Sequence, residues 1–525
     1  MAQPADFDSD DSFGSDSPPL WDFPLRCMTE VKRLPSWRRG ILRQTQNYDP
    51  FVDVALKSFD SDLRESIKGF TRSPGDQWDL AEKFRRYDRP ALSLNKGDSR
   101  FTAAYEQAVS DTMRDFKLDA PIVPHWILDV DLVKSTSSGY PHFARKGDII
   151  DQIRQEGRYH LHHLKLYDLH RCPLLPCTMS TRGGLSEVTD PKTRLVWMYP
   201  AAMTACEAVY AQPLIDAIYS QKRDLLLTGV DSKHRIQRYL SLLGDDDLGT
   251  CGLGLDFKSF DNCRVNSLIR DAFSVLRQNV KFGWYYDKVT GLQRGRSGVD
   301  KRAEKAFDNI VEYFINTPML LPNGRIVTKH TGIPSGSHFT NLIDSIINRI
   351  LMKTFSYYES IPLRQLRTNG DDSASTVSPD YSDIVIPKAT VFFEKFFGMT
   401  VSVDKSVLAF VPSAMHVSGT TWTGLRPTRT TEEWFMLAAY SDTYISEPFD
   451  SFQRLLGLGI AGGFTDQKFV RFFDYFQSGY DCRHNDRLLN WKKLRWLEHA
   501  FNITDLPLVY KQGARTLTRL RLLVS

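Results

Sequence analysis

The chain has little cysteine and no long apolar run. Seven cysteines in 525 residues, an odd number, are too few for a disulfide framework and suit a reducing compartment. No run of about 18 apolar residues occurs, so we predict no transmembrane helix and expect no membrane contact. The N-terminus also lacks the basic and apolar blocks of a signal peptide. The length instead predicts about two to four structural units, and a hydrophobic content of 42% is ample for their cores.

Basic residues are absent from the first 25 positions, which contain six aspartates. We predict that residues 1–25 form a disordered acidic tail. Without this tail the net charge of the chain rises from +4 to +10. That balance is consistent with a polyanionic ligand, although it does not identify one.

An apolar run ends in a carboxylate within CGLGLDFKSFDNC, residues 251–263. Asp256 follows the predicted buried strand directly, and Asp261 comes five residues later. A carboxylate just past the end of a buried strand is well placed to meet a ligand. Taken alone, this spacing belongs more often to aspartates that cap turns.

Two adjacent aspartates occupy the predicted turn in RTNGDDSAST, residues 367–376. Asn369-Gly370 between apolar stretches predicts a β-hairpin, because Gly readily takes a positive φ, and Asp371 and Asp372 then lie at its tip. A solvated turn is the competing interpretation. Adjacent carboxylates repel each other, however, and a bound divalent cation would turn that repulsion into attraction.

A glycine-containing loop precedes a predicted helix in TGIPSGSHFTNLIDSIINRILMKTF, residues 331–355. Thr340 and Asp344 lie one turn apart on a polar face, which a solvated surface would also explain. The opposite face carries apolar residues at helical spacing and predicts burial in a core: Phe339, Leu342, Ile343, Ile346, Ile347, Ile350 and Leu351.

These three segments resemble a known set of motifs. DFKSFD, PSGSHFTNLIDS and GDDS, in this order, are similar to motifs A, B and C of viral RNA-dependent RNA polymerases, most of all those of partitiviruses and picobirnaviruses. The flanking segments also resemble motifs of this family, so that the likeness covers roughly residues 130 to 430: motif G at 134–148, motif F at 180–200, motif D at 396–410 and motif E at 415–429.

The resemblance implies a fold of the α/β (α+β) class, shaped as a right hand with fingers, palm and thumb. It further implies that the palm is an antiparallel sheet packed on helices and that fingertips close the hand. The expected division is a tail at 1–25, an N-terminal extension and fingers at 26–250, palm at 251–280, a fingers insertion at 281–330, palm at 331–415, motif E and thumb at 416–510, and a basic tail at 511–525.

The resemblance also implies roles for individual residues. Asp256 and Asp371 are expected to bind two Mg²⁺ ions, for which Mn²⁺ can substitute, with support from Asp372. Lys405 in motif D matches a lysine expected to protonate the leaving pyrophosphate. The expected nucleotide-binding residues are Asp261, Ser335, Gly336, Thr340, Arg182, Lys192 and Arg194, and the expected template-binding residues are Ser137, Ser138, Gly139, Tyr140 and Pro141.

The expected partners are an RNA template, the product strand, NTPs and capsid protein, with the virion interior and host cytoplasm as locations. Asp344 departs from the Asn that many positive-strand RNA virus polymerases carry in motif B, and its role stays open. Two alternatives are a reverse transcriptase and a non-catalytic RNA-binding virion protein. Asp261 and the absence of a Tyr-x-Asp-Asp turn disfavour the first, and the motif aspartates, which would repel phosphate without a metal, disfavour the second.

Three further segments carry weaker signals. In 160–177, four histidines and two cysteines lack the spacing of a zinc site, and we favour core or surface roles for them. Trp491 and Trp496 in 487–502 predict a packed thumb helix rather than an RNA-stacking surface. Residues 511–525 are basic and apolar, and we hypothesise that they either enter the product tunnel or dock on the thumb.

Overall fold

The architecture comes from a computed structural model of the 525-residue chain, in which part of the chain is described. The described residues are 20–35, 37, 47–72, 76–221, 225–226, 236–241, 249–295, 299–410, 415–417, 420–423, 426–441 and 445–480. The predicted helix at 487–502 and the tail at 511–525 lie outside them. None of the helices in these ranges is both long and apolar enough to span a membrane.

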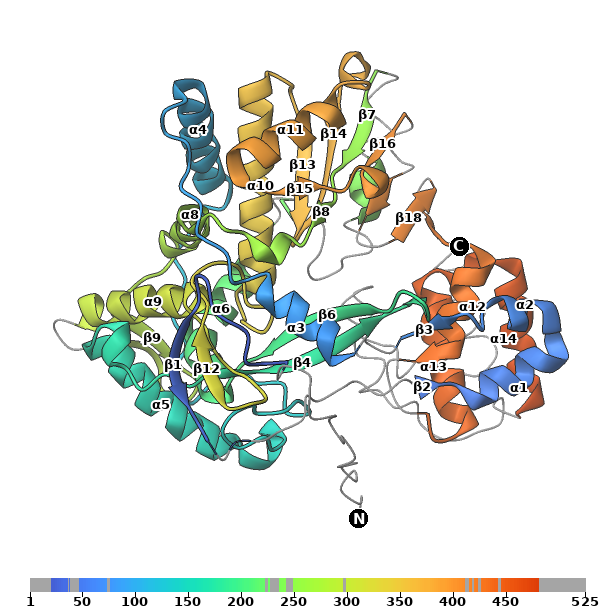
Figure 1. Ribbon diagram of the computed structural model, residues 1–525, viewed down its shortest axis with the longest axis horizontal. Coiled ribbons are helices and arrows are strands. Elements are labelled where there is room, and N and C mark those ends of the chain that lie inside the picture. Colours follow the sequence, from blue (N-terminus) through green and yellow to red (C-terminus); the bar gives the residue numbers. More distant parts are fainter. Residues whose placement is uncertain are drawn as a thin grey trace.

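A four-stranded antiparallel sheet, which we call the palm sheet, carries the hairpin predicted around Asn369-Gly370. Helix α10 (Thr340–Glu359) packs against it, with α11 (Val385–Phe397) and α4 (Ser99–Asp115) beside α10 (Figure 1). The predicted antiparallel sheet on helices is therefore confirmed. In order across the palm sheet its strands are β13 (Arg364–Asn369), β14 (Asp372–Val377), β7 (Cys251–Gly254) and β16 (Val407–Ala409).

Apolar periodicity explains why α10 lies where it does. All seven residues of its predicted apolar stripe are buried, none more than 1% exposed. Together with α8 (Asn266–Arg277) and α11 they belong to one large core that continues into the fingers. Two short ladders complete the palm: β8 (Phe257–Lys258) pairs with β15 (Thr400–Val401), and β18 (Thr420–Thr423) pairs with β17 (His416–Val417) on one side and β19 (Arg426–Thr428) on the other.

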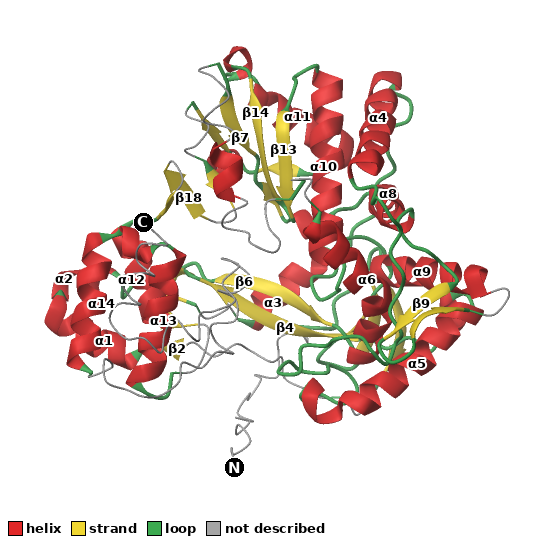
Figure 2. Cartoon of the chain, turned by 180° about the vertical axis from the view of Figure 1, so that it is seen from behind, coloured by secondary structure: helices red, strands yellow, loops and turns green. Residues whose placement is uncertain are grey.

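A five-stranded mixed sheet forms the fingers, in which β11 and β4 are parallel and the other neighbours antiparallel. Strands β4 and β6 extend from this sheet as a long ribbon (Figure 2). The strands in order are β1 (Thr29–Arg33), β12 (Arg325–Thr328), β11 (Pro318–Leu320), β4 (Cys177–Gly184) and β6 (Lys192–Met198). The accompanying elements are α3 (Gln77–Arg85), α5 (Ile150–Leu166), α6 (Ala201–Ser220), α9 (Val299–Ile315) and the hairpin β9 (Trp284–Asp287) with β10 (Gly291–Arg294).

The C-terminal helices, in the region expected to contain the thumb, form a separate aromatic core. They are α12 (Thr431–Ala439), α13 (Pro448–Ala461) and α14 (Gln467–Gly479). Part of the expected N-terminal extension, within 26–250, also belongs to this core. Helices α1 (Pro50–Phe59) and α2 (Ser61–Ser66) pack into this C-terminal core, and β2 (Asn47–Tyr48) pairs with β20 (Tyr440–Ser441) (Figure 1).

The ribbon tip contacts the C-terminal helical unit. Strand β5 (Ser186–Glu187) at the tip pairs with β3 (Phe70–Thr71), which leads out of α2. Leu185 at the same tip packs against the aromatic core of the C-terminal helices. This contact joins fingers to the C-terminal unit and confirms the expectation that fingertips close the hand.

The end of the predicted acidic tail is ordered rather than disordered. Leu20, Trp21 and Phe23 are each at most 8% exposed and belong to the main core. The Arg325 guanidinium donates to the carbonyls of Trp21 and Phe23, at 3.0 and 2.9 Å. The prediction for 1–25 is therefore wrong for residues 20–25, because their apolar side chains pack on the core; residues 1–19 lie outside the described ranges.

Asp49 joins the N-terminal helices to the C-terminal ones. It is fully buried, and its carboxylate accepts from the backbone N–H groups of Phe51 and Val52, both at 3.1 Å, as the N-cap of α1. The same carboxylate accepts from Ser451 Oγ at 2.8 Å and pairs with Arg454 at 3.3 Å, both on α13. One side chain thus caps α1 and holds it to α13 within the C-terminal unit.

We predict that Asp49→Ala lowers the free energy of unfolding of the C-terminal unit by about 3 kcal/mol, because it removes a cap and leaves buried donors unsatisfied. Urea unfolding and limited proteolysis measure this. Asp76→Ala removes only the exposed N-cap of α3 and should cost about 1 kcal/mol. Equal costs for the two variants would contradict the joining role of Asp49.

Candidate active site

The predicted acidic residues meet at one end of the palm sheet. Strand β7 ends just before Asp256. Asp371 lies in the turn between β13 and β14, and Asp372 is the first residue of β14; Gly370 in the same turn has φ +60°, as the hairpin prediction requires. Because β14 runs antiparallel to β7 with Ser375 opposite Leu253, the start of β14 and the end of β7 lie at the same end of the palm sheet, which we call the carboxylate edge. The sheet register therefore brings together carboxylates that are more than 100 residues apart in the chain.

Like charges dominate this edge. Burial, with the charges of Asp371 and Asp256, raises the pKa of Asp372 to about 6. Burial also raises the pKa of Asp256; the positive charge of Lys405 opposes this rise and the negative charge of Asp371 adds to it. The motif D loop is tied to the same point, because Ser402 N–H donates to the Asp256 carbonyl at 2.7 Å and Asp256 N–H donates to Ser406 Oγ at 3.1 Å.

The donor set at this edge fits a divalent cation in its chemistry. Asp256, Asp371 and Asp372 offer only carboxylate oxygens, the ligands that Mg²⁺ and Mn²⁺ prefer, and they repel one another without a cation. Within the described ranges, no three acidic, histidine or cysteine side chains already converge at metal-binding distance. Bringing these carboxylates onto one ion would relieve the repulsion that adds to the effect of burial on the pKa values of Asp256 and Asp372.

The polar face of α10 binds the aspartate turn and is not simply solvated. Asn348 Nδ2 donates to the carbonyls of Gly370 and Asp371, at 3.2 and 2.8 Å. Ser345 Oγ accepts from Gly370 N–H at 2.8 Å. Asn341 Nδ2 contacts the side chain of Asn369 at 3.3 Å. The buried helix therefore fixes the backbone of the turn with neutral hydrogen-bonding groups that add no charge.

Asp261 is held by a tyrosine for which sequence reasoning had no signal. The hydroxyl of Tyr87 donates to Asp261 Oδ2 at 2.8 Å. The Asp261 carbonyl accepts from Ile333 N–H at 2.7 Å, which ties motif A to the loop of motif B. Burial raises the pKa of Asp261, and the hydrogen bond from Tyr87 opposes that rise. Tyr87 lies in FRRYDRP, where no motif or periodicity distinguishes it.

Asp344, whose role the sequence left open, lies close to this group. Burial, followed by the charges of Asp371 and Asp261, raises its pKa well above the ordinary value. Its Oδ1 is buried without a hydrogen-bond partner among the described residues. A protonated Asp344 is neutral and can donate a hydrogen bond, as the side-chain amide of an Asn can.

The predicted motif B residues pack the loop onto β6. Ser335 Oγ accepts from Trp197 N–H at 3.2 Å, and the side chain stays exposed. A Cβ on Gly336 would come within 1.8 Å of the Trp197 carbonyl, so only glycine fits this approach. Thr340 Oγ1 lies 2.7 Å from the Pro334 carbonyl and closes the loop. These contacts place the loop against the strand that carries the motif F residues.

A buried glutamate and a buried lysine, neither predicted, hold the rest of this loop. Glu207 on α6 is fully buried and accepts from Ser337 Oγ at 2.8 Å and from His338 N–H at 2.9 Å. Burial raises its pKa to about 8. Lys329 is also fully buried and donates to three carbonyls, including that of Gly332 at 2.7 Å.

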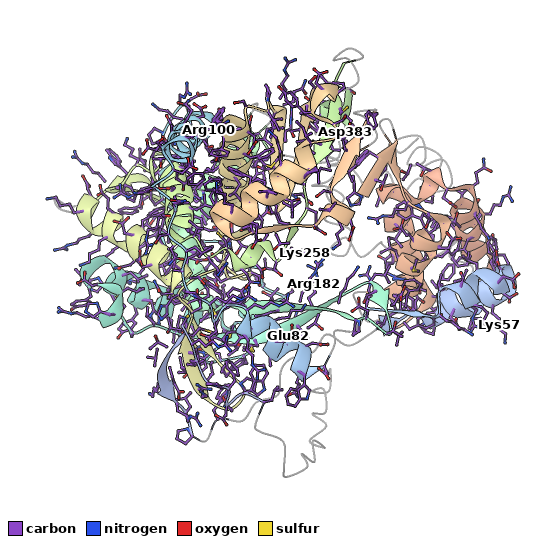
Figure 3. All side chains as sticks on the ribbon, turned by 45° about the horizontal axis from the view of Figure 1, so that its top comes forward. Lys57, Glu82, Arg100, Arg182, Lys258 and Asp383 are labelled. Carbon is purple, nitrogen blue, oxygen red and sulfur yellow. The ribbon has the colours of Figure 1, made fainter. Side chains whose placement is uncertain are left out.

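Three cations project from the β4–β6 ribbon. Arg182, Lys192 and Arg194 are all exposed, and Arg182 lies directly opposite Arg194 in the register. Like charges at directly opposed positions destabilise a strand pair, so this arrangement favours an anionic ligand. Figure 3 shows Arg182 on the ribbon and Lys258 on the palm side.

A basic groove of about 710 Å³ runs behind the motif A turn. Six basic and two acidic side chains line it. The carboxylate of Asp88 is occupied by the backbone N–H groups of residues 26–28, and Glu82 pairs with Arg86. The six basic residues are Arg26, Arg85, Arg86, Arg89, Lys258 and Arg264.

The predicted motif G residues form a compact loop. Ser138 is 1% exposed, and its backbone bonds to Ala144 and Ala201, so its side chain is not accessible to a template. Gly139 has φ +65° and lies against the Tyr199 carbonyl. Ser137 Oγ accepts from Gly139 N–H at 3.2 Å, the Tyr140 ring contacts Trp37 and Phe143, and Pro141 stays exposed.

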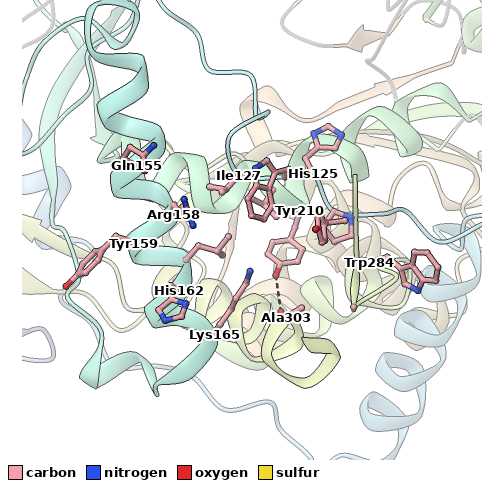
Figure 4. Close-up of a pocket in the computed structure, with 16 residues that line it drawn as sticks. His125, Ile127, Gln155, Arg158, Tyr159, His162, Lys165, Tyr210, Trp284 and Ala303 are labelled. Atoms are coloured by element: carbon pink, nitrogen blue, oxygen red, sulfur yellow. Dashed lines mark hydrogen bonds between the residues drawn. The ribbon is translucent and has the colours of Figure 1, made fainter. Parts of the chain in front are cut away.

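A separate pocket of about 560 Å³ lies between α5, α6 and the β9–β10 hairpin (Figure 4). It is lined by Trp126, Tyr210 and Trp284 together with Arg158 and Lys165, and none of the predicted site residues belongs to it. Part of the histidine-rich segment lies here: His162 lines the pocket, whereas His160 on the same helix is 8% exposed.

Comparison with known proteins places the chain among polymerases. A family model of viral RNA-dependent RNA polymerases matches residues 48–477. The RNA-directed RNA polymerase of Cryptosporidium parvum virus 1 is 30% identical over 177 residues, which are 34% of this chain and 30% of that protein. A "potential RNA-dependent RNA polymerase" of a human picobirnavirus is 28% identical over 228 residues, 42% of this chain and 38% of that one. The chain thus spans about a third of the length of these curated relatives.

Solved structures show the same fold. The RNA-dependent RNA polymerase of a human picobirnavirus superposes with a TM-score of 0.62 at 15% identity and covers 95% of this chain and 94% of its own. The Sicinivirus 3Dpol RNA-dependent RNA polymerase superposes with a TM-score of 0.64 at 14% identity, over 90% of this chain and 99% of its own. At this identity the likeness establishes the right-hand fold.

We predict that Glu207→Gln is tolerated and gains stability relative to the wild type as pH rises. A raised pKa means that the folded state holds a proton that the unfolded state has lost, so wild-type stability falls between about pH 4.5 and 8. Gln keeps the carbonyl acceptor and cannot ionise, so its advantage should reach about 1–3 kcal/mol at pH 8.

Urea unfolding at pH 5 and pH 8 measures this difference. Glu207→Ala serves as the control, because it leaves Ser337 Oγ and His338 N–H without their acceptor and should be destabilised at both pH values. A Glu207→Gln variant that lost stability on going from pH 5 to pH 8 as steeply as the wild type would contradict the assignment.

Proposed function

The chain belongs to the viral RNA-dependent RNA polymerases, and from this membership we propose that it extends an RNA strand on an RNA template, replicating and transcribing a viral, double-stranded RNA genome. The observation that carries the proposal is the meeting of Asp256 with the Asp371–Asp372 turn at one edge of the palm sheet. Mutually repelling carboxylates at a strand edge suit in-line phosphoryl transfer assisted by divalent cations.

Asp256 and Asp371 would hold two divalent cations, with Asp372 in support. Mg²⁺ is the proposed ion and Mn²⁺ a substitute, because both prefer carboxylate oxygens. When bound, the cations supply a lowered pKa for the attacking RNA 3′-hydroxyl and charge neutralisation at the triphosphate. Asn348 and Ser345 on α10 orient the turn so that both aspartate side chains stay free of competing hydrogen bonds from the helix.

The incoming NTP would meet the exposed cations of the ribbon. Arg182, Lys192 and Arg194 are placed to bind the triphosphate, and Arg guanidinium groups suit it because they can donate two parallel hydrogen bonds. The basic groove beside the motif A turn is a suitable path for a polyanionic substrate. Asp261, Ser335, Gly336 and Thr340 would form the sugar side of the same site.

Lys405 would give a proton to the leaving pyrophosphate. It lies close enough to Asp256 for its charge to oppose the rise that burial causes in the pKa of that carboxyl, and its side chain is exposed. An exposed ammonium beside the reacting phosphates is a suitable general acid. The motif G loop, from Ser137 to Pro141, would contact the template through its exposed members.

The proposed partners are the RNA template, the product strand and NTPs. Capsid protein as a further partner, and the virion interior and host cytoplasm as locations, rest only on the resemblance to polymerases of double-stranded-RNA viruses. A reverse transcriptase would incorporate dNTPs, and a non-catalytic RNA-binding protein would incorporate neither kind of nucleotide. Incorporation of labelled rNTPs and dNTPs on an RNA template therefore distinguishes an RNA polymerase from a reverse transcriptase and from a non-catalytic RNA-binding protein.

We expect Asp371→Ala to reduce nucleotide incorporation by roughly a thousandfold or more while template binding stays near the wild-type value. Primer extension with labelled NTPs and a filter-binding assay measure the two properties. Asp383→Ala, which removes an exposed aspartate outside the motifs, is the matched control and should keep full activity. Full incorporation by Asp371→Ala would overturn the proposed active site.

Stabilisation by Mg²⁺ should depend on pH. The raised pKa of Asp372 means that its ionised form costs stability as pH rises from about 4 through about 6, and a bound cation would offset that cost. Below pH 6 a proton competes with the cation. Mg²⁺ should therefore raise the midpoint of thermal unfolding by about 2 °C or more at pH 7.5 and by less at pH 5.

Differential scanning fluorimetry with and without a chelator measures this shift. The double variant Asp256→Asn/Asp371→Asn should show no Mg²⁺-dependent shift of the unfolding midpoint at either pH. A shift of the same size at pH 5 and 7.5, or one that survives in the double variant, would show that the cation binds elsewhere.

A further inference from the structure

Tyr87 lies where three motif segments meet. It follows the C-terminal end of α3 and is 2% exposed, although none of the segments it contacts is near it in sequence. Its ring packs edge-on against Trp197 on β6, with ring centroids 5.2 Å apart. A Cβ on Gly332 would lie 2.7 Å from the same ring, so glycine is needed for the motif B loop to pass.

The hydroxyl of Tyr87 makes the polar contact in this arrangement. It donates to Asp261 Oδ2 at 2.8 Å and lies 3.3 Å from the Ile333 carbonyl. Burial, together with the charge of Asp261, keeps the pKa of Tyr87 well above its usual range, so the phenol remains a donor. Among the described residues, no side chain donates to the other carboxylate oxygen, Oδ1.

This geometry leaves one oxygen of Asp261 for a ligand. A carboxylate held at one oxygen has a restricted side-chain rotation, because the hydrogen bond selects one rotamer. The remaining oxygen can accept a hydrogen bond from a ligand. A ligand without a donor at that point would leave this oxygen buried and unpaired, which is costly, so such a ligand is disfavoured. The hydroxyl that distinguishes a ribonucleotide from a deoxyribonucleotide is such a donor.

We propose that Tyr87 is a positioning residue for sugar selection, which fixes Asp261 so that its free oxygen accepts the 2′-hydroxyl of the incoming ribonucleotide. The inference rests on the proposed polymerase function and deepens it. Tyr87 would affect the sugar only through Asp261. Its own position is set by its contacts with the motif B loop and with β6, the strand that carries Arg194.

Tyr87→Phe tests the proposal, because it keeps the ring that packs on Trp197 and Gly332 and removes only the hydroxyl. The ratio of kcat/KM for an rNTP to kcat/KM for the matching dNTP should fall about tenfold, the loss expected for one hydrogen bond to a charged group. The fall should arise mainly from a raised KM for rNTP, since the residues proposed to act in the chemical step are untouched.

The chain offers a matched control. Tyr105 on α4 is 7% exposed, and its hydroxyl donates at 2.7 Å to Asp271, a half-buried aspartate on α8 outside the polymerase motifs. Tyr105→Phe therefore removes a buried Tyr–Asp hydrogen bond of the same kind. It should lower the free energy of unfolding about as much as Tyr87→Phe and leave sugar discrimination unchanged.

A double-mutant cycle shows whether Tyr87 acts through Asp261. Asp261→Asn alone should also reduce discrimination, and adding Tyr87→Phe should change it no further. Unchanged discrimination in Tyr87→Phe, an equal effect of Tyr105→Phe, or additive effects with Asp261→Asn would each overturn the inference. A wild-type chain that incorporates no NTP would instead overturn the proposed function, so the two failures are distinguishable.

Discussion

The repulsion between clustered carboxylates is the constraint on which the site depends. The charge of Asp371 acts on Asp256, Asp261, Asp344 and Asp372, and burial raises the pKa of each of these four. A protein keeps such a cluster only if the surrounding structure determines each position without neutralising the charges. Here the neutral groups of α10 and a tyrosine hydroxyl do so, and they leave the carboxylate edge available to cations.

The supporting contacts are long-range and mostly buried. Glu207 and Lys329 hold the motif B loop from α6 and from the end of β12, and Ser335 and Gly336 place the same loop on β6. Because a fully buried side chain costs much to displace, the loop position follows from the core of the fingers. The proposed nucleotide site is thus assembled by packing between palm and fingers as well as by the contacts of α10 within the palm.

Closure of the hand also depends on contacts between segments that are far apart in the sequence. The tip of the β4–β6 ribbon reaches the C-terminal helices through Leu185 and the β3–β5 pair, and Asp49 joins α1 to α13. An N-terminal segment therefore completes the C-terminal unit. The cations of the ribbon lie on strands β4 and β6, between the five-stranded sheet and the ribbon tip, so their positions depend on how each end of the ribbon is held.

The sequence by itself determined the local elements and the family. The Asn369-Gly370 turn, the apolar stripe of α10 and the order of the motifs follow from short-range patterns, which are set by backbone conformation and periodicity. Only the tertiary structure decided which distant side chains support them. Tyr87, Glu207 and Asp49 have no local signal, because a hydrogen bond across 130 residues or more depends on packing and not on spacing. The same reason explains the ordered residues 20–25, whose apolar side chains pack on a core that composition cannot reveal.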